Sequence, residues 1–425
     1  MTDQNRRSLL QILGPGILFA GAAVGVSHLI QSTRAGGIYG LALIGFIIFA
    51  NVAKYPALRF GNQYAAASGS NLIEAYQRQG RFSLWVFIIS TLLTMFAGCA
   101  AISITTAGLA KVTFGLQADT FLVVLGVWAT VITILFLGEY KALDAIVKVL
   151  LAFLTITTVA ATALVLPHLE FTGLNALWPE QLDPTTVIFI AALIGWMPAP
   201  LDTSVWQSLW SQAKARTDNH QPTVKESALD FNIGFIGTTI LAICFVIMGA
   251  GVMHKSGVEF EASAAGFAAQ LVDIYRQTLG DTMATLVGAA AMAVIFTTTL
   301  TAIDAWPRSM AGVMLIIQSK DKPHEPVISQ IRHPYYWLWM GVLLLGAAVI
   351  LKLLANSFSL LVDIATTVSF LTAPLFAILN HIAMFSAEVP LDKRPGEGMR
   401  RWSLLAIGAL LIFTAGYLVL RITNG

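Results

Sequence analysis

Two short stretches of this chain combine helix-breaking residues with side chains that can bind a ligand. The first is Gly25-Val26-Ser27-His28, inside an apolar run from 12 to 30. The second is Gly195-Trp196-Met197-Pro198-Ala199-Pro200, inside an apolar run that begins near 187. The hydrocarbon core of a bilayer contains no water that could hydrogen-bond to backbone N–H and C=O groups released by a helix break. Irregular backbone at that depth is therefore buried in protein or lines a cavity. Two such broken helices, one in each half of a chain, indicate a transporter's binding site.

The first break offers hydroxyl and imidazole groups together with backbone ligands. Unwinding at Gly25 would free carbonyls and amides and would present Ser27 and His28. Ionisable residues at membrane depth are costly and mark functional sites, which favours a substrate-binding role for His28. The alternative is a kink at Gly25, with His28 bonded to a neighbouring helix.

The second break offers carbonyls and a thioether. Pro198 and Pro200 have no N–H, so the carbonyls of Ile194 and Gly195 lose their helical donors and become candidate ligands. Met197 is an equally good candidate for a ligand and for a core residue. The predicted substrate-binding residues of both breaks are therefore Gly25, Ser27, His28, Ile194, Gly195, Trp196, Met197 and Ala199.

Aspartates and threonines near the breaks could carry a coupling ion. Asp202 follows Ala199 by three residues, which predicts one face of the second half-helix, one turn beyond the break. Asp304 lies one turn after Thr301 in a threonine-rich span. We expect both aspartates to be proton carriers or charge partners, with Thr298 and Thr301 as further ion-coupling candidates.

Other charged residues near the spans are expected to have structural roles. Asp230 is expected to cap the start of the seventh span, and Asp363 to lie at the membrane interface. Lys54 is expected to snorkel to the cytoplasmic face. Glu139 and Asp144 are expected in a short solvated loop between the fourth and fifth spans.

Composition excludes a water-soluble globular protein. Of the 425 residues, 56% are hydrophobic and 11% are charged, whereas a soluble surface needs about a quarter charged. The net charge of +2 gives no basis for nucleic-acid binding. Cys99 and Cys244 lie in apolar runs and indicate neither a disulfide framework nor a metal cluster. Signatures of enzymes are absent, as is a cleavable signal peptide, so we expect no catalysis and no resident cofactor.

Apolar runs of about 20 residues predict eleven membrane spans. They lie near 12–33, 39–60, 84–112, 119–138, 144–166, 186–211, 230–253, 284–314, 334–354, 358–384 and 402–422. The segments predicted to be inside contain Arg6, Arg7, Arg78, Arg81, Lys141, Lys148, Lys214, Arg216, Lys225, Lys320, Lys322, Arg332, Lys393, Arg394, Arg400 and Arg401. The positive-inside rule then places the N-terminus in the cytoplasm and the C-terminus outside a plasma membrane. Between the seventh and eighth spans, 259–275 is expected to form an amphipathic surface helix.

Spans 1–5 and 6–10 each begin with an interrupted helix. A repeat of five spans must insert with opposite topology the second time, as in many secondary transporters. We therefore predict an all-α integral membrane protein with one transporter domain over 1–425. Its inverted repeats are expected at about 12–166 and 186–384, followed by an extra helix at 402–422. The expected partners are the lipid bilayer and a small substrate, with the chain acting as a monomer.

Several motifs resemble the Nramp family of proton-coupled divalent-metal transporters. They are Gly14-Pro15-Gly16, Ala35-Gly36-Gly37-Ile38-Tyr39-Gly40, Gly69-Ser70-Asn71-Leu72-Ile73-Glu74, Gly138-Glu139-Tyr140-Lys141-Ala142-Leu143-Asp144 and Met197-Pro198. Their order and spacing match the family through spans 1–6, and the span count extends the likeness to the whole chain. The resemblance implies a LeuT-like fold with five-plus-five inverted repeats and an eleventh helix. It also implies transport of a metal cation by ion-coupled alternating access.

The departures from the family motifs fall where the metal should bind. The family has Asp-Pro-Gly-Asn at the first break, so its coordinating Asp is replaced by Gly25 and its Asn by His28. Ala199 replaces the His of the family's Met-Pro-His motif. From 85 to 109, span 3 has no acidic residue, although the family's proton route implies one.

Two substrate hypotheses remain open on the sequence. A metal cation would use His28 and Met197 as ligands, with Asp202 as a candidate carboxylate. The imidazole and the thioether favour a softer metal than manganese or magnesium. A small organic solute would instead be held by a half-helix N-terminus, with Trp196 and Trp206 lining the pocket. In that case, the threonines of span 8 could bind a sodium ion.

Overall fold

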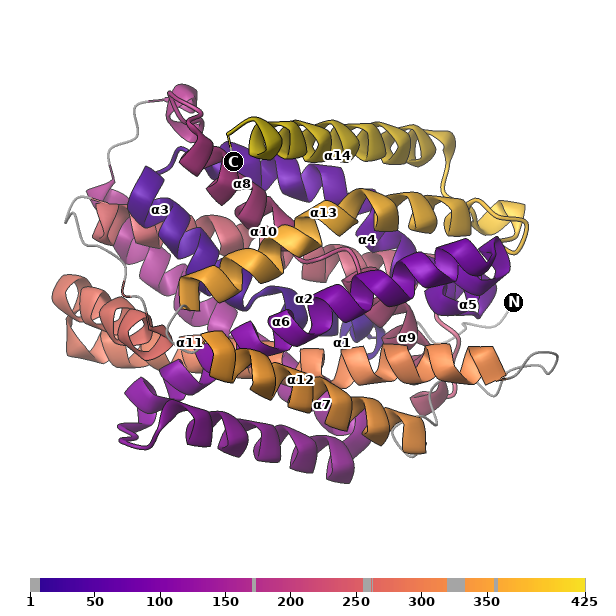
Figure 1. The fold of residues 1–425 in the computed structure, drawn as a ribbon, viewed down its shortest axis with the longest axis horizontal. Coiled ribbons are helices and arrows are strands. Elements are labelled where there is room, and N and C mark those ends of the chain that lie inside the picture. Colours follow the sequence, from indigo (N-terminus) through magenta and orange to yellow (C-terminus); the bar gives the residue numbers. More distant parts are fainter. Residues whose placement is uncertain are drawn as a thin grey trace.

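The computed structural model describes residues 8–169, 173–254, 261, 263–318, 333–354 and 358–424. Within these residues the chain is helical and contains no strand. The helices are α1 Leu9–Ile12, α2 Pro15–Ala23, the π-helical turn Val26–Ser32, α3 Thr33–Tyr39, α4 Ile44–Ser68, α5 Leu72–Gln79, α6 Arg81–Phe114, α7 Thr120–Val165, α8 Pro184–Trp196, α9 Thr203–Thr217, α10 Val224–Val252, α11 Ala264–Gln318, α12 Pro334–Leu354, α13 Phe358–Met384 and α14 Glu397–Asn424. Figure 1 shows them packed as one bundle.

Nine helical segments of the described chain are long and apolar enough to cross a membrane. The other two predicted spans correspond to α4, which contains Lys54 and Arg59, and to the interrupted pair α8 and α9. The eleven predicted spans therefore each have a helical counterpart. Arg6, Arg7, Lys320, Lys322 and Arg332 lie outside the described residues, and the orientation of the termini stays a prediction.

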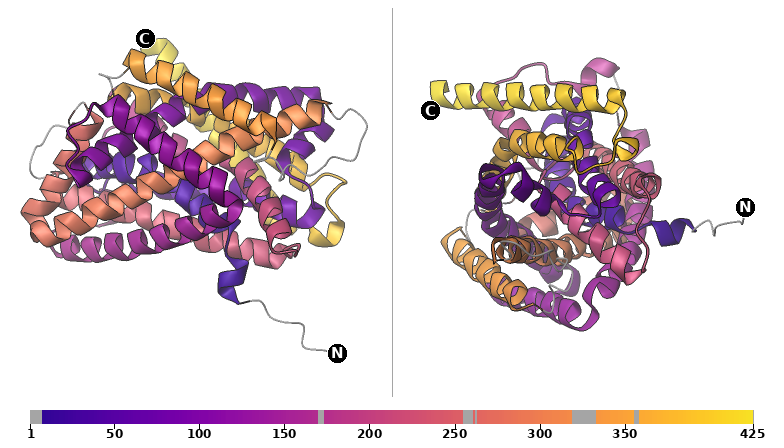
Figure 2. Two further views of the ribbon diagram at one scale, coloured as in Figure 1. Left: turned by 90° about the horizontal axis from the view of Figure 1, so that it is seen from below. Right: turned by 90° about the vertical axis from the view of Figure 1, so that its right-hand side faces the viewer.

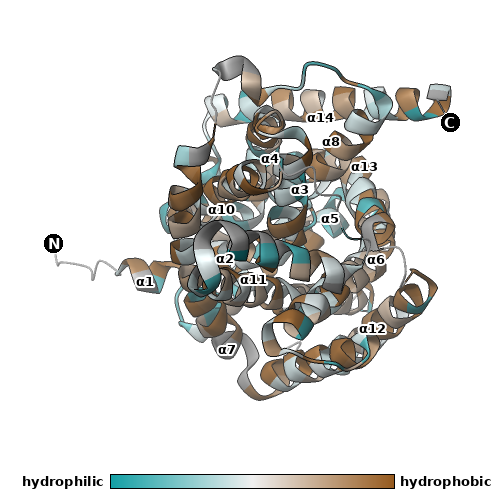
Figure 3. Ribbon diagram, turned by 90° about the vertical axis from the view of Figure 1, so that its left-hand side faces the viewer, coloured by the Kyte–Doolittle hydropathy of each residue, from teal (hydrophilic) through white to brown (hydrophobic). Residues whose placement is uncertain are grey.

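The interrupted first span lies at the centre of the bundle, and the most apolar faces lie outside. In the segment Pro15–Tyr39, 94% of the most apolar window is buried, against 22% in α12 and 28% in α14. Figure 2 shows α14 along one side of the bundle, where it contacts α4 and α13. In Figure 3 the outer helices α7, α12 and α14 are mostly brown, and teal segments lie inside the bundle. A polar interior behind an apolar exterior is the arrangement that a bilayer requires.

Helices α7 and α11 each extend far beyond a single predicted span. Helix α7 covers spans 4 and 5, so the backbone at 139–144, where a solvated loop was expected, is helical instead. Within it, Asp144 pairs with Lys148 at 2.6 Å, one turn away. Helix α11 bends at Gly280, which has a φ of 81°. Its first part overlaps the amphipathic helix predicted at 259–275; Phe260 lies outside the described residues, and Phe267 is buried against the bundle.

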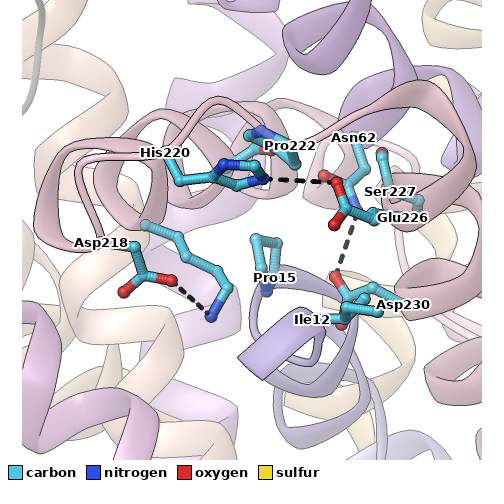
Figure 4. A pocket seen from close by; sticks show the side chains of 11 residues that line it. Ile12, Pro15, Asn62, Asp218, His220, Pro222, Glu226, Ser227 and Asp230 are labelled. Carbon is cyan, nitrogen blue, oxygen red and sulfur yellow. Dashed lines mark hydrogen bonds and ion pairs between the residues drawn. The ribbon is translucent and has the colours of Figure 1, made fainter. Parts of the chain in front are cut away.

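The N-terminal end of the first span is held by Asp230, two turns into α10. Its carboxylate accepts hydrogen bonds from the backbone N–H of Gly14 at 2.9 Å and of Gly16 at 2.7 Å. The Asn62 amide adds a bond of 3.3 Å, drawn in Figure 4. Asp230 therefore caps α2, and the prediction that it caps its own helix is wrong, since Thr223 and Glu226 form the capping box of α10. The contact could not be read from spacing because it joins residues more than 200 positions apart.

Candidate functional site: a cavity between two helix breaks

The first span is interrupted after Ala23, as the sequence predicts. Val24 and Gly25 leave the helical conformation, and a π-helical turn over Val26–Ser32 leads into α3. The Ser27 hydroxyl bonds to Ala23 O at 2.7 Å. Local side-chain bonding of this kind partly replaces the helical bonds that the break removes.

Gly25 is required by a close approach to α11. A Cβ atom at this position would lie 2.3 Å from Thr298 Oγ1 and 2.8 Å from Thr298 Cβ. The same hydroxyl donates to Gly21 O at 2.9 Å, so Thr298 joins the first break to span 8. The other predicted threonine, Thr301, bonds only to carbonyls of its own helix, at Thr297 and Thr298.

We expect Gly25→Ala to destabilise the protein by about 1–3 kcal/mol, the usual cost of overpacking. The added methyl group would push Thr298 away from Gly21 and disturb the break. Thermal unfolding in detergent measures the loss, and Gly237→Ala is a matched control because a Cβ at position 237 meets nothing within 4 Å. Equal melting temperatures for the two variants would contradict the expectation.

The second break separates α8 from α9 over residues 197–202. Lys54 of α4 enters this break, where its ammonium donates to the carbonyls of Ile194 at 2.6 Å, Gly195 at 2.8 Å and Ala199 at 3.1 Å. Lys54 is 0% exposed. The prediction that it snorkels to the cytoplasmic face is therefore wrong: freed carbonyls in the bundle offer the ammonium better partners than a distant interface.

Asp202 lies within the break and not one turn beyond it, which corrects the predicted position. It is the N-cap residue of α9, but its side chain makes no capping hydrogen bond. The carboxylate is buried, and Oδ1 has no hydrogen-bond partner. The indole N–H of Trp306 lies near enough to stabilise its charge, without hydrogen-bond geometry to either carboxylate oxygen. The N-terminus of α9 also favours a negative charge here.

A cavity of about 30 Å³ lies between the two breaks. Its polar walls come from five hydroxyl residues and one carboxylate, and three indoles cover much of the rest. These residues are Ser27, Thr94, Thr203, Thr298, Ser369, Asp202, Trp196, Trp206 and Trp306. The volume suffices for about two waters or one partly dehydrated ion. The polar side chains that line it carry oxygen atoms or indole N–H groups.

Two predicted ligands do not line this cavity. His28 is fully buried; its Nε2 lies 3.0 Å from Thr238 O and its Nδ1 lies 2.8 Å from Ser27 Oγ. A metal ion would have to displace one of these bonds to reach the imidazole. Met197 is completely buried in an apolar cluster with Phe189 and Phe370. Their role as metal ligands stays a prediction.

The remaining predicted site residues are close to the breaks. Trp196 lines the cavity and donates to Ser369 Oγ at 2.8 Å. Gly195 lets α8 approach α13, since a Cβ at this position would lie 2.0 Å from Thr366 O. Ala199 and Ile194 contribute carbonyls to Lys54.

Asp304 lies apart from the cavity in a buried ion pair with Arg308, a partner that the sequence analysis did not name. Arg308, one turn later, donates to both carboxylate oxygens at 2.6 and 3.0 Å. The Trp210 indole and the Tyr336 hydroxyl each add a bond of 3.1 Å. The i,i+4 spacing of Asp304 and Arg308 was the available signal.

Asp363 lies at the start of α13 with 37% of its side chain exposed. Its carboxylate lies 3.5 Å from Arg34 Nη1 in α3. The ion pair joins the C-terminal end of the first span to the N-terminal end of the tenth, and the interfacial position of Asp363 stays a prediction.

The sequence model of the natural resistance-associated macrophage protein-like family, Nramp, matches residues 16–421. The chain belongs to the Nramp family. An uncharacterised protein of Pasteurella multocida is 34% identical over 409 residues, 95% of this chain and 90% of that protein. The divalent metal cation transporter MntH of Yersinia pestis is 24% identical over 267 residues, 60% of this chain and 64% of MntH.

Solved structures with the same fold include that of the Eremococcus coleocola manganese transporter, which superposes with a TM-score of 0.67. The match covers 98% of this chain and 88% of the transporter, and the sequences are 15% identical. MhsT in complex with L-phenylalanine matches over the full length of both chains, with a TM-score of 0.62 at 14% identity. This Nramp protein is thus a multi-pass membrane protein of a transporter family, with the LeuT-like fold. The repeat boundaries at about 12–166 and 186–384 stay predictions.

Proposed function

We propose that this protein is a secondary transporter that moves a divalent metal cation across the plasma membrane by alternating access. The unpartnered carboxylate oxygen of Asp202 in the cavity between the two breaks carries the proposal. A buried carboxylate oxygen without a hydrogen bond is costly, and a cation in the cavity would lower that cost. Membership of the Nramp family and the similarity to MntH support the class of substrate.

The groups around the cavity favour a metal that prefers oxygen ligands. Asp202, the hydroxyls of Ser27 and Thr298 and bound waters form a set suited to manganese or magnesium. Copper(I) and other soft metals would need sulfur or imidazole, which His28 and Met197 do not present to the cavity. Transport would be coupled to a proton or sodium ion, with Asp202, Asp304 and Thr298 as the proposed coupling residues.

A small organic solute is the second candidate, because three indoles border the cavity. Trp306 Nε1 has no hydrogen-bond partner and could donate to such a substrate. A cavity of about 30 Å³ is too small for an amino acid, so this function would require the outer or inner helices to move apart.

Uptake by the purified protein in liposomes tests the proposal. We expect saturable uptake of manganese, competed by magnesium and stimulated by an inward proton or sodium gradient. Liposomes without protein and liposomes with equal gradients on both sides are the controls. Uptake of an amino acid or another organic solute, without uptake of any divalent metal, would favour the second candidate and reject the first.

A further inference from the structure

Backbone carbonyls of the second break surround the ammonium group of Lys54, a cation supplied by the protein's own side chain. In a continuous helix, Pro198 and Ala199 would supply donors to Ile194 and Gly195, but proline has no N–H and the backbone leaves the helix here. Three carbonyls, those of Ile194, Gly195 and Ala199, instead converge on one nitrogen atom. Converging backbone carbonyls are also the ligands with which proteins bind alkali cations.

The Lys54 ammonium uses all its hydrogen-bonding capacity in this cage. It has three donors and makes three bonds, of 2.6, 2.8 and 3.1 Å. Its stem comes from α4 and is completely buried. The nearby Asp202 carboxylate attracts the ammonium electrostatically. The three carbonyls of the cage are therefore occupied by the ammonium.

We propose that the Lys54 ammonium is a resident cation in a carbonyl cage, and that a small neutral side chain at this position opens a binding site for sodium or potassium. The cage also takes these carbonyls out of the ligand set of any transported ion, which leaves Asp202 and the hydroxyls to bind it. This proposal is independent of the transported substrate, because the cage and its occupant are formed by the backbone and Lys54.

Thermal unfolding of the purified full-length protein in detergent tests the proposal, in sodium, potassium and choline chloride at equal ionic strength. The wild type should melt at one temperature in all three salts. Lys54→Ala should melt lower in choline and regain about 5 °C in sodium or potassium, with a saturable dependence on concentration. Lys54→Met fills the same space without a charge, so it should be destabilised equally in all three salts.

Equal melting of Lys54→Ala in the three salts would mean that water replaces the ammonium, and would overturn the proposal. Lys54→Ser provides a second variant, whose hydroxyl can join the carbonyls around an ion. If Lys54→Ala and Lys54→Ser fold in none of the salts while Lys54→Arg folds, an alkali cation does not substitute for the side chain and the proposal is wrong. Folding of either small variant only in sodium or potassium would support it.

Discussion

Replacing Asp202 by Asn is expected to lower the initial rate of metal uptake by about 100-fold. The substitution keeps the shape of the side chain but removes the single carboxylate that lines the cavity. Loss of one partner of a buried charge interaction costs about 2–5 kcal/mol, which corresponds to a change of that order. The measurement is manganese uptake into liposomes containing equal amounts of folded protein.

Asp363→Asn is the matched control for Asp202→Asn. It makes the same chemical change at an aspartate that pairs with Arg34 of α3 and does not line the cavity. We expect this variant to retain uptake within about twofold, since half-exposed ion pairs contribute little. Uptake by Asp202→Asn at a rate close to that of the control would remove Asp202 from the transport site.

Replacing Arg308 by Met is expected to cause the largest loss of stability. Arg308 and Asp304 are both buried, and the substitution leaves the Asp304 carboxylate with only the Trp210 and Tyr336 donors. Breaking a buried pair from one side costs about 3–5 kcal/mol, which should lower the melting temperature by about 5 °C. Thermal unfolding in detergent measures the change.

The double variant Asp304→Leu with Arg308→Met separates the structural role of this pair from a role in ion coupling. Without the stranded charge, most of the lost stability should return. A double variant no more stable than Arg308→Met would contradict this expectation. If the double variant folds and transports but no longer responds to a proton gradient, Asp304 has the coupling role that we propose.

The sequence was sufficient to predict features that depend on local composition. Apolar runs located the spans, and the glycine and proline residues located both breaks, because their effects on backbone hydrogen bonding act within one turn. Asp202 was selected for the same reason, although its position at the N-cap of α9 required the structure. The loss of the family's acidic residue at Gly25 was also visible in the sequence, but the Thr298 side chain that fills its space was not.

The features that the sequence did not predict are contacts between distant segments. Lys54 was expected at the cytoplasmic face because snorkelling is the usual behaviour of a lysine near the end of a span. Its actual partners lie 140 or more positions away, and no local pattern joins them. Asp230 was assigned to the wrong helix for the same reason. Such contacts are decided by which faces of the helices meet in the bundle.

Isothermal titration of the purified protein with manganese and magnesium, in the wild type and in Asp202→Asn, tests the central claim most directly. The cavity between the breaks is proposed to bind a divalent cation through Asp202. We expect saturable binding in the wild type, a loss of binding in Asp202→Asn and no change in Asp363→Asn. Metal binding that is unaltered in Asp202→Asn, or an absence of binding in folded wild-type protein, would contradict the proposed site.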